Sequence, residues 1–413
     1  MRTDRLIILG NGGAAINAVK AIRSAGHEGD IHMISDSSGP AFNPMLAPYY
    51  LKNIIPWENC FPFGIDFYKQ YDVKCYFGSP VVFVDTLNRI IVLKNEKRLH
   101  YDKCLIATGA SPIMPPVPGL RDSAKALPLR TALQTKTIES AIPKAKKVAV
   151  MGASLVGVKL AEILRKKGLE VILLDIAPNI LPQGSHPKTA EFLRKYIIQQ
   201  GIDLRLSCNV EYLEETQKGF VCPFPEGEEE IGFIAVCAGI KPNIAFINSS
   251  SISVDQAILV DEKMRTSTDG LYAAGDVCQG YNPISGKQEW LGTWVNACCQ
   301  GRTAGLNMAG SDAIYQGNIP QHISPLFDWS YAQIGDIKCN GNHKVISKGD
   351  PFKGEYCLLV FKKDILVGAN LINCTEKAGI IRNAILRKTN LRTKGLLKPF
   401  SYENIFYDFV YQS

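Results

Sequence analysis

Short apolar runs, each followed by a glycine turn and a stretch of helical period, occur twice along the chain. The first repeat covers residues 5–36, RLIILGNGGAAINAVKAIRSAGHEGDIHMISD, and indicates a strand, a turn, a helix that reaches Ala25 and a second strand that ends at Asp36. The second repeat covers residues 147–175, KVAVMGASLVGVKLAEILRKKGLEVILLD, and has the same order. This alternation predicts an α/β protein that contains two Rossmann-like units.

The first turn has small residues at the three positions of the G-x-G-x-x-A pattern of dinucleotide-binding proteins, namely Gly10, Gly12 and Ala15. Gly10 permits the tight turn, Gly12 lets the backbone approach a pyrophosphate, and Ala15 lets the helix pack on the strand. The helix N-terminus then presents unpaired N–H groups to the phosphates. Asp36, 26 residues after Gly10, should accept hydrogen bonds from the adenosine ribose. A glycine-rich turn without a ligand is the alternative.

The second turn has Gly152 and Gly157 at the outer positions of G-x-G-x-x-G and Ser154 at the middle one. Serine is small, so close approach of a phosphate remains possible. Asp175 lies 23 residues after Gly152, and the next basic residue is Lys188. A carboxylate at that position repels a 2′-phosphate and binds a free 2′-hydroxyl, so we predict NAD rather than NADP. Two such units imply two dinucleotides.

Length and composition are those of an ordinary multi-domain globular protein. The 413 residues suffice for roughly two to four domains, and the contents of 46% apolar and 21% charged residues do not indicate disorder. The chain has no run of about 18 apolar residues, and its first residues lack the apolar segment of a signal peptide. We therefore expect a cytoplasmic protein without a membrane span.

The twelve cysteines and six histidines are scattered. They form no C-x-x-C or C-x-x-x-x-C pair, and the only adjacent thiols are those of Cys298 and Cys299. A chain of this size does not need disulfides, and zinc or iron–sulfur sites need clustered ligands. Mostly reduced, buried thiols and no metal site are therefore predicted.

The positive charge is concentrated in one segment. Residues 341–400 contain twelve Lys or Arg and four Asp or Glu, whereas the whole chain has a net charge of +7. Such a surplus suits an acidic protein partner, a nucleic acid or a membrane surface, and a solvated face is the alternative. We expect no nucleic-acid binding, because no recognised module or regular aromatic interleaving accompanies the charge.

Five further motifs follow in order along the chain. They are YDKCLIATGASP (101–112), LRT (129–131), VCAGIKPN (236–243), TSTDGLYAAGDV (266–277) and GTWVNACCQGRTAGLNMAG (292–310). With the two glycine turns, these motifs resemble the FAD- and NAD(P)-dependent pyridine-nucleotide oxidoreductases. That family has a disulfide-reductase-like architecture and includes ferredoxin and rubredoxin reductases, NADH oxidases and CoA-disulfide reductases.

The resemblance implies an FAD domain interrupted by an NAD domain and followed by a C-terminal α+β domain. The implied bounds are 1–119 and 250–314 for FAD, 120–249 for NAD, and 315–413 for the C-terminal domain. The implied FAD-binding residues are Gly10, Gly12, Ala15, Asp36, Ala107, Thr108, Gly109, Arg130, Gly275, Asp276, Thr293 and Trp294. Thr293 should cap a helix from Trp294 to Met308, whose N-terminus would face the flavin.

The implied NAD-binding residues are Gly152, Ser154, Gly157, Lys159, Asp175 and Gly239. Lys159 departs from the family, which usually has Glu near the nicotinamide at this position. Lys159 could turn outward along the helix without a role. Alternatively, it could contact the NAD phosphate or carboxamide, or pair with an acid such as Glu162.

The segment AFNPMLAPYYLK (41–52) should lie beside the flavin ring. In relatives with a single redox cysteine, the matching position is Met45 here, and a thioether cannot form a thiolate or a mixed disulfide. A lysine that ferredoxin-reductase relatives often carry is replaced by Pro48. Met45 and Pro48 are thus candidate wall residues of a thiol-free flavin edge. Cys298 and Cys299 remain as possible redox thiols, with plain packing as the alternative.

The C-terminal segment suggests a protein partner. SPLFDWSYAQIG (324–335) resembles a flavin-lining segment of ferredoxin-reductase relatives, which makes Phe327 and Trp329 candidate wall residues, with core packing as the alternative. The basic surplus precedes FSYENIFYDFVYQS (400–413), which contains six aromatic residues. A basic surface beside an aromatic tail suits an acidic partner or permanent assembly, and either a homo-oligomer or a hetero-oligomer is compatible with it.

We therefore predict an FAD-dependent NADH oxidoreductase that exchanges electrons with an acidic iron–sulfur protein of ferredoxin type. It could act as the NAD-reactive subunit of a multi-subunit dehydrogenase such as an anaerobic 2-oxoacid oxidoreductase. Two alternatives stay open. The protein could reduce oxygen, a quinone or another small molecule by itself, or it could serve mainly in interaction and assembly with slow turnover, like the apoptosis-inducing-factor branch.

Overall fold

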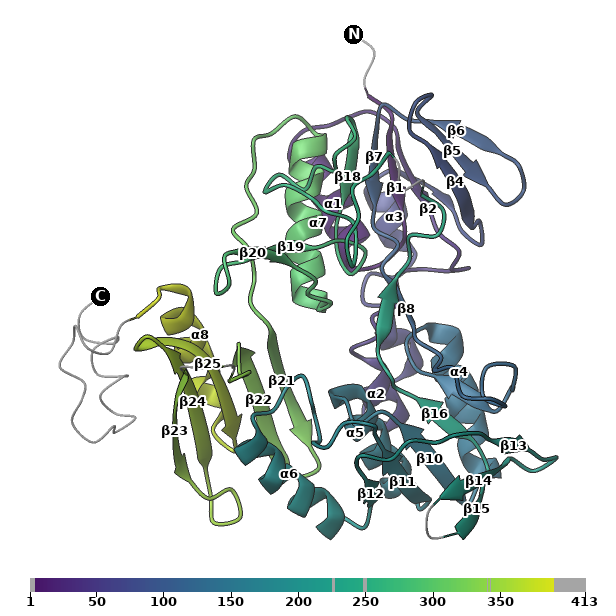
Figure 1. The fold of residues 1–413 in the computed structure, drawn as a ribbon. Helices are drawn as coiled ribbons and strands as arrows, with labels where there is room; N and C mark the ends of the chain where they lie inside the picture. The colour runs from purple at the N-terminus through teal and green to yellow at the C-terminus, as the bar shows by residue number, and fades with distance from the viewer. Residues whose placement is uncertain (1–3, 225–226, 248–250, 340, 342, 390–413) are drawn as a thin grey trace. The chain divides into compact units, whose positions relative to one another are not determined.

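A computed structural model describes residues 4–224, 227–247, 251–339, 341 and 343–389 (Figure 1). The chain forms two compact units by its internal contacts. The first unit consists of Met1–Met114, Leu127–Pro143 and Gly239–Asn318, and the second of Pro115–Ala126, Lys144–Ala238 and Ile319–Ser413. The aromatic segment 400–413 lies outside the described residues, as do three of the cations in the basic segment, at positions 392, 394 and 398.

The first unit is built on a five-stranded parallel sheet in the order β18-β7-β1-β2-β3. Its strands are β1 (Leu6–Leu9), β2 (Ile31–Ile34), β3 (Val73–Tyr76), β7 (Lys103–Ile106) and β18 (Leu271–Ala273). All four residues of β1 are buried, as is typical of a central parallel strand covered on both faces. Because β18 follows the second glycine repeat in the sequence, that repeat interrupts this unit, as predicted.

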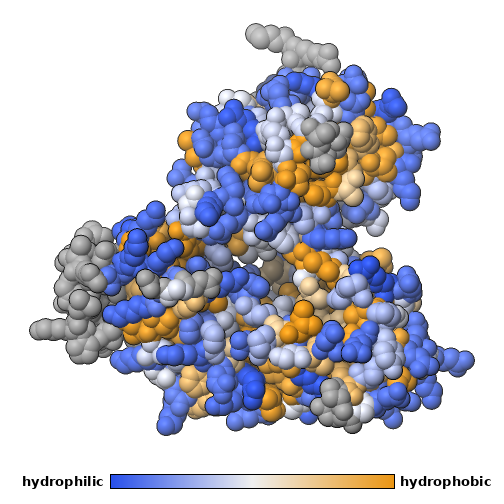
Figure 2. Space-filling view, in the orientation of Figure 1, coloured by the Kyte–Doolittle hydropathy of each residue, from blue (hydrophilic) through white to orange (hydrophobic). Residues whose placement is uncertain are grey.

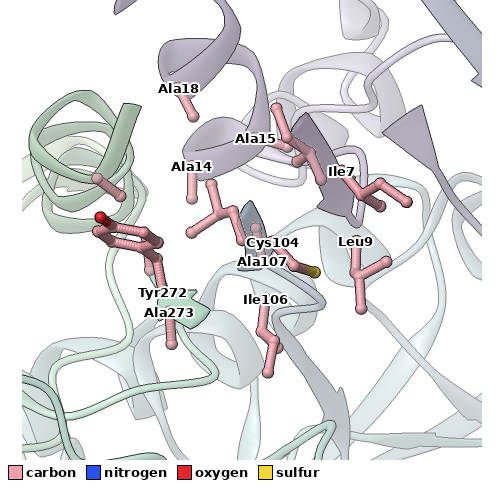
Figure 3. Close-up of a cluster of buried hydrophobic side chains, with 14 of the residues drawn as sticks. Ile7, Leu9, Ala14, Ala15, Ala18, Cys104, Ile106, Ala107, Tyr272 and Ala273 are labelled. Atoms are coloured by element: carbon pink, nitrogen blue, oxygen red, sulfur yellow. The ribbon is translucent and has the colours of Figure 1, made fainter. Parts of the chain in front are cut away.

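Two helices of small residues pack tightly beside this sheet, α1 (Gly13–Ser24) and α7 (Trp294–Met308). A Cβ added at Gly301 would lie 2.1 Å from the carbonyl oxygen of Ala14, and one at Gly305 would lie 2.4 Å from that of Ala18. Figure 3 shows Ala14 and Ala18 between α1 and the green helix α7. The backbones therefore approach so closely that only glycine fits on α7.

Smaller elements complete the first unit. An antiparallel sheet contains β4 (Val81–Asp85), β5 (Ile90–Leu93) and β6 (Arg98–His100), and two-stranded pairs join β8 (Ala110–Pro112) to β17 (Ile240–Pro242) and β19 (Gly280–Asn282) to β20 (Lys287–Glu289). The helical segments are α2 (Ala47–Leu51), η1 (Trp57–Cys60), α3 (Asp66–Gln70), α4 (Ala132–Ala141) and η2 (Ile142–Lys144). A capping box between Thr131 and Gln134 fixes the start of α4.

The second unit contains most of a second Rossmann-like sheet in the order β12-β11-β10-β16-β9, whose strand β9 begins at Ala126, the last residue of a segment of that unit. Its elements are β9 (Ala126–Pro128), β10 (Lys147–Met151), α5 (Leu155–Lys166), β11 (Glu170–Leu174), α6 (Pro187–Gln199), β12 (Asp203–Arg205) and β16 (Ile234–Val236). β10, β11, β12 and β16 run parallel. A small antiparallel sheet of β13 (Glu214–Glu215), β14 (Phe220–Phe224) and β15 (Gly227–Ile231) precedes β16. With the first sheet, this arrangement confirms the predicted α/β class.

The second unit also contains an antiparallel C-terminal sheet in the order β21-β22-β25-β24-β23, with β23 at its outer edge (Figure 1). Its elements are β21 (Gln321–Leu326), β22 (Trp329–Gly335), β23 (His343–Gly349), β24 (Tyr356–Lys362), β25 (Ile365–Ile372), η3 (Thr375–Lys377) and α8 (Ala378–Leu386). Helix α8 packs on β22 and β25. Strands β24 and β25 are almost continuously buried, so both faces of their sheet are covered.

Hydrogen bonds, one buried and two partly buried, join the C-terminal sheet to the Rossmann-like part of the second unit. The Tyr331 hydroxyl donates to the Gly184 carbonyl oxygen at 2.5 Å, and the amide nitrogen of Asn370 donates to the same oxygen at 2.9 Å. The backbone N–H of His186 donates to Asn370 Oδ1 at 2.8 Å. Burial raises the pKa of Tyr331, which keeps its hydroxyl protonated as the donor. These two parts therefore form one folded body.

Exposed apolar side chains are scattered over the surface. Among the largest are Leu87, 93% exposed in the turn between β4 and β5, and Ile176, 77% exposed after β11. Figure 2 shows such side chains in orange among hydrophilic ones. No helix among the described residues has both the length and the apolar character that a membrane crossing requires. The four-part division implied by the resemblance stays a prediction, because the two units are coarser.

Candidate functional site

The first glycine turn joins β1 to α1. Gly10 has φ +113°, and a Cβ there would lie 2.1 Å from the carbonyl oxygen of Ala107, so only glycine fits. Gly12 is the N-cap residue of α1, and a Cβ at Gly12 would meet no atom within 4 Å. Ala15 is fully buried against the sheet (Figure 3). The turn therefore has the predicted geometry and leaves open space at its middle position.

Two residues that the sequence analysis missed hold this turn. The amide nitrogen of Asn11 donates to the carbonyl oxygen of Gly39 at 3.0 Å, and the Tyr68 hydroxyl donates to Asn11 Oδ1 at 2.7 Å. The same hydroxyl accepts the backbone N–H of Ala41 at 3.0 Å. Burial raises the pKa of Tyr68 to about 12, so the phenol stays a donor. Tyr68 lies far from the motif in sequence, and no spacing rule could have identified it.

The Ala107-Thr108-Gly109 segment meets the segment after β17. The Thr108 hydroxyl donates to the carbonyl oxygen of Asn243 at 2.9 Å, and the Asn243 side-chain amide donates to the carbonyl oxygen of Thr108 at 2.9 Å. The backbone N–H of Asn243 donates to the carbonyl oxygen of Gly109 at 3.0 Å. Asn243, the last residue of the VCAGIKPN motif, is therefore the residue that locks this chain crossing.

The structure brings together two predicted FAD residues that are far apart in sequence. Arg130 forms an ion pair with Asp276, and its Nε donates to the carbonyl oxygen of Ala110 at 3.0 Å. Asp276 is 9% exposed, and its carbonyl oxygen accepts the indole N–H of Trp290 at 2.8 Å. The preceding Gly275 has φ +85°. Arg130 bonds to Oδ2 of Asp276, and the carboxylate keeps further lone pairs with which it could accept a ribityl hydroxyl.

Helix α7 begins where the sequence predicts. Thr293 is its N-cap, and the Thr293 hydroxyl oxygen accepts the backbone N–H of Asn296 at 3.3 Å. The Trp294 ring lies against α1, because a Cβ added at Gly13 would be 3.1 Å from it and 3.2 Å from Cys298 Sγ. The N-terminus of α7 is thus fixed beside the first glycine turn.

The loop that carries Met45 and Pro48 joins β2 to α3. Met45 is 54% exposed, and Pro48 is half-buried in the first turn of the short helix α2. The next turn of this segment is anchored to α4, because the Tyr50 hydroxyl donates to Glu139 and accepts from Lys136. Lys136 Nζ also lies 4.4 Å from the centre of the Trp57 ring. No sequence motif marks this cluster of Tyr50, Trp57, Lys136 and Glu139, because its members come from separate segments.

These features fit FAD at the first turn. The α1 N-terminus has no acidic residue in its first turn, and Gly12 leaves space for a pyrophosphate beside it. Asp36 is exposed two residues after β2, where it could accept bonds from the adenosine ribose. Gly109 has φ +67° and open space at its Cβ position. The residues therefore form a cradle of backbone groups with one charged pair, Arg130 and Asp276.

The second glycine turn joins β10 to α5 and is capped by one of its own side chains. Gly152 has φ +111°, and its Cβ would lie 2.4 Å from the carbonyl oxygen of Cys237. A Cβ at Gly157 would lie 1.9 Å from the carbonyl oxygen of Gly152. The Ser154 hydroxyl accepts the backbone N–H of Gly157 at 3.3 Å and donates to the Cys237 carbonyl oxygen at 3.2 Å. Ser154 is therefore the N-cap of α5 and satisfies part of its own helix terminus.

Asp175 is bound to the same turn. Its Oδ2 accepts the backbone N–H of Ala153 at 2.7 Å, and its Oδ1 accepts that of Ala177 at 2.8 Å. Each oxygen has a second lone pair, so the carboxylate can still bind a ribose hydroxyl. Arg205 on the neighbouring strand β12 is the nearest cation by sheet register, and its guanidinium pairs with Asp203 and Glu229. The arrangement agrees with a preference for NAD over NADP.

Lys159 lies inside the second unit, so the outward orientation is wrong. Lys159 is 9% exposed, and its Nζ donates to the Ser324 hydroxyl of β21 at 2.7 Å. Glu162 lies one helical turn further and is fully buried. A contact between Lys159 and NAD stays a prediction. Gly239 has φ +104°, and its carbonyl oxygen accepts the backbone N–H of Ile113 at 2.9 Å in the first unit.

Phe327 and Trp329 are both 8% exposed within the second unit. The Trp329 ring stacks on Tyr196 of α6 with centroids 3.7 Å apart and planes 2° from parallel. The Phe327 ring meets the same tyrosine edge-on at 6.2 Å. Their surroundings support the core-packing alternative, and a role as flavin wall stays a prediction.

All twelve cysteines are free thiols within the described residues. Burial raises the pKa of Cys298 to about 11, so this thiol stays protonated at neutral pH and is a poor nucleophile. Cys299, its neighbour, is exposed. Among the described residues, no group of three or more His, Cys, Asp or Glu side chains has the arrangement of a metal site.

Comparison with known proteins adds to this geometry. A family model described as pyridine nucleotide-disulphide oxidoreductase matches residues 4–301. The chain is 27% identical over 391 residues to the NADH-dependent phenylglyoxylate dehydrogenase subunit epsilon of Aromatoleum evansii, with 94% of this chain and 92% of that protein covered. It is 27% identical over 377 residues to the 3-phenylpropionate/cinnamic acid dioxygenase ferredoxin–NAD(+) reductase component of Photorhabdus laumondii subsp. laumondii, covering 90% and 94%.

The fold has solved counterparts. The water-forming NADH oxidase from Lactobacillus brevis, bound to NADH, matches with a TM-score of 0.89 over 97% of this chain and 95% of that chain. Sequence identity in this comparison is 20%, so the match speaks for the fold alone. Both glycine turns therefore belong to an architecture with two dinucleotide domains.

Proposed function

The chain belongs to the pyridine nucleotide-disulphide oxidoreductase family and is an NAD(H)-dependent flavoprotein oxidoreductase, and we propose that it exchanges electrons between NAD(H) and an iron–sulfur protein of ferredoxin type. FAD, when bound, takes up two electrons as hydride from NADH and can release them one at a time. The family match confirms the predicted family and, with it, the two cofactors FAD and NAD. The acceptor is the part that we propose.

The observation that carries the proposal is that a methionine stands at the position expected for a redox thiol after β2, while Cys60, the cysteine of the same segment, is buried and has its pKa raised by that burial. The residue at the expected thiol position is Met45, which is 54% exposed and cannot form a disulfide. Cys298, the thiol nearest to the first glycine turn in the contacts described, has its pKa raised by burial to about 11. A disulfide substrate would need an accessible thiolate, so a disulfide acceptor is disfavoured.

The chain's own residues have defined tasks in this reaction. The first turn and Asp36 hold the FAD phosphates and ribose, and Arg130 orients Asp276 toward the ribityl chain. The N-terminus of α7 places partial positive charge beside the same turn, which favours negative charge on the reduced cofactor. The second turn and Asp175 hold NAD(H). These residues bind and orient, and none of them needs to form a covalent bond.

The relative in Aromatoleum evansii is named as a subunit of an NADH-dependent dehydrogenase. We therefore extend the proposal to a role as the NAD-reactive FAD subunit of a larger dehydrogenase, in which electrons could also flow from the partner to NAD. The other relative is named as a ferredoxin–NAD(+) reductase component. Both names agree with a protein partner as the electron donor or acceptor.

The test is a comparison of acceptors under identical conditions. The FAD-loaded protein is reduced anaerobically by NADH in a stopped-flow instrument and then mixed with an oxidised ferredoxin, with oxygen, or with CoA disulfide. We expect the ferredoxin to reoxidise the protein at about 1 per second or faster, in the range of ordinary enzymes. The disulfide should react at least tenfold more slowly. Equal or faster reoxidation by oxygen would instead support an NADH oxidase, and rapid reaction with the disulfide would exclude the proposal.

A further inference from the structure

Most of the exposed cations of the C-terminal sheet and its flanking segments lie at one of its two ends. Strand β23 begins at His343 and β24 ends at Lys362, and the register pairs these two residues, with Lys344 opposite Phe361. Lys344 and Lys362 therefore lie at the same end of the sheet. Lys363, the first residue of the turn into β25, lies there as well.

Helix α8 brings two more cations to this end. The backbone N–H of Leu366, near the start of β25, donates to the carbonyl oxygen of Thr389 at 3.4 Å. Arg387 and Lys388 directly precede Thr389, so they lie next to the start of β25. We call Lys344, Lys362, Lys363, Arg387 and Lys388 the basic end. All five are exposed, and none forms an ion pair with another described residue.

The opposite end of the same sheet is electrically balanced. It comprises the connection between β23 and β24 and the segment after β25, where three acids, Asp350, Glu355 and Glu376, accompany Lys348, Lys353 and Lys377. Lys377 Nζ pairs with Glu355 at 2.5 Å and with Glu376 at 3.8 Å. At the basic end, two acids lie among residues 335–338, 343–344, 362–367 and 387–389, namely Asp364 and Asp336, and the backbone N–H of Asp336 donates to the carbonyl oxygen of Val367 at 2.8 Å. They face six cations, the five of the basic end and Lys338. The charge surplus is thus localised rather than spread over a solvated face.

Protection of an exposed sheet edge explains only part of this arrangement. Lysine on an outer strand discourages pairing with other chains, which accounts for Lys344 and Lys348 on β23. Lys363 lies in a turn, and Arg387 and Lys388 follow a helix, so none of them guards the edge. Clustered like charges repel one another, and their common use is to steer an oppositely charged partner.

We propose that the basic end is the docking surface for an acidic protein, namely the iron–sulfur partner, and this inference rests on the proposed function for the partner's identity. Charge complementarity supports an acidic protein face, because the cations come from three segments and form a broad patch rather than a single pocket. Rim charges of this kind raise the association rate and make binding sensitive to salt.

The test compares two charge-reversed variants of the full-length, FAD-loaded protein. In the first, Lys362→Glu and Arg387→Glu change the basic end. In the second, Lys348→Glu and Lys353→Glu make the same change in charge at the balanced end of the same sheet. The probe is a purified acidic [4Fe–4S] ferredoxin, and its dissociation constant is measured by titration calorimetry at 20 and 300 mM salt. NADH-dependent reduction of the ferredoxin and of menadione, a neutral acceptor, is measured in parallel.

We expect the first variant to bind the ferredoxin at least tenfold more weakly at low salt, with a flatter salt dependence. The second variant should stay within twofold of the wild type, and all three proteins should reduce menadione at equal rates. Equal ferredoxin affinity in both variants would overturn the docking surface, and so would failure of the wild type to bind ferredoxin. Binding of the wild type to phosphatidylglycerol vesicles, lost in the first variant, would assign the basic end to a membrane instead.

The measurements separate this inference from the proposed function. If the ferredoxin is reduced rapidly but both variants bind it alike, the proposed function is supported and the basic end is not the docking surface. If the ferredoxin binds through the basic end but the NADH-treated protein does not reduce it, the basic end is a docking surface and the proposed function is wrong.

Discussion

The two glycine turns have the same backbone conformation at their first glycine, but they differ at their middle position. In each turn the first glycine has φ near +110°, and its missing Cβ makes room for a carbonyl oxygen, that of Ala107 at Gly10 and that of Cys237 at Gly152. The middle position differs. Gly12 faces open space, whereas the Ser154 hydroxyl caps its own helix. The helix after the first turn thus begins without a side-chain cap, and the helix after the second turn has one.

The acids after the second strands differ in the same way. Asp36 is exposed, whereas both oxygens of Asp175 accept backbone N–H groups. When the hydrogen-bonding groups of a site are paired within the protein, release of the ligand leaves few of them unpaired and costs little free energy. Such a site suits NAD(H), a substrate that must leave after each turnover. A site with open donors gains more from its ligand, which suits FAD, a cofactor that stays bound. We propose that this difference in local hydrogen bonding underlies tight binding of FAD at the first turn and exchange of NAD(H) at the second.

The largest effect is expected from Gly10→Ala. The new Cβ would overlap the Ala107 carbonyl oxygen at 2.1 Å, so β1 or β7 must move, and we expect the free energy of unfolding to fall by about 3 kcal/mol together with loss of bound FAD. Urea unfolding and the flavin absorbance per chain are the measurements. Gly26→Ala is the control, because Gly26 also has a positive φ, +83°, but open space, and should cost only about 1 kcal/mol. Full FAD content in Gly10→Ala would contradict the first-turn assignment.

The next effect separates folding from binding at the first turn. Gly12→Ala adds a methyl group where no atom lies within 4 Å, so stability without FAD should stay within about 0.5 kcal/mol of the wild type. The methyl group would occupy the pyrophosphate space, and the FAD dissociation constant should rise about tenfold or more, as read from titration of the apoprotein. Ser154→Ala, at the same position of the second turn, should instead cost about 1 kcal/mol of stability through the lost cap. Similar stability losses in both variants would remove the contrast between the turns.

Much of the first unit could be predicted from the sequence because its chemistry is local. The strand, turn, helix and acid follow one another within residues 5–36, and the helix from Trp294 to Met308 begins at its Thr293 cap as predicted. Asn11, Tyr68 and Asn243 were missed as structural ties. Each of them bonds to a partner far away in sequence, and spacing patterns carry no information on such pairs.

A smaller effect is expected at the acid of the second turn. Asp175→Asn replaces one acceptor oxygen with an N–H donor, which would face the backbone N–H of Ala153 or Ala177. We expect the NADH dissociation constant to rise about fivefold, which corresponds to about 1 kcal/mol, and the preference over NADPH to narrow. Fluorescence titration with both nucleotides measures this. Asp36→Asn is the matched control and should leave NADH binding unchanged. An unchanged NADH affinity in Asp175→Asn would show that the carboxylate serves only the turn.

The sequence was least informative where the second unit departs from its family. The helix pattern alone does not distinguish an outward orientation of Lys159 from a nucleotide contact or a pairing with an acid such as Glu162, because it does not say which element covers that face. The partner proved to be Ser324, 165 residues later on β21. The same holds for Phe327 and Trp329, whose packing against Tyr196 depends on how the C-terminal sheet covers α6.

The smallest effect on nucleotide binding is expected at Lys159, the residue that most distinguishes the second turn from the first. Lys159→Met keeps the length of the side chain and removes the bond to Ser324, so we expect a loss of about 1 to 3 kcal/mol in the free energy of unfolding. The NADH dissociation constant should change less than twofold, because Nζ is directed at the Ser324 hydroxyl of β21. In a double-mutant cycle with Ser324→Ala, a coupling energy of about 0.5 kcal/mol or more would confirm the contact, since neighbours that share a bond are not additive. If Lys159→Met instead weakens NADH binding fivefold without loss of stability, Lys159 contacts the nucleotide, and the second turn binds its ligand with a charged side chain that the first turn lacks.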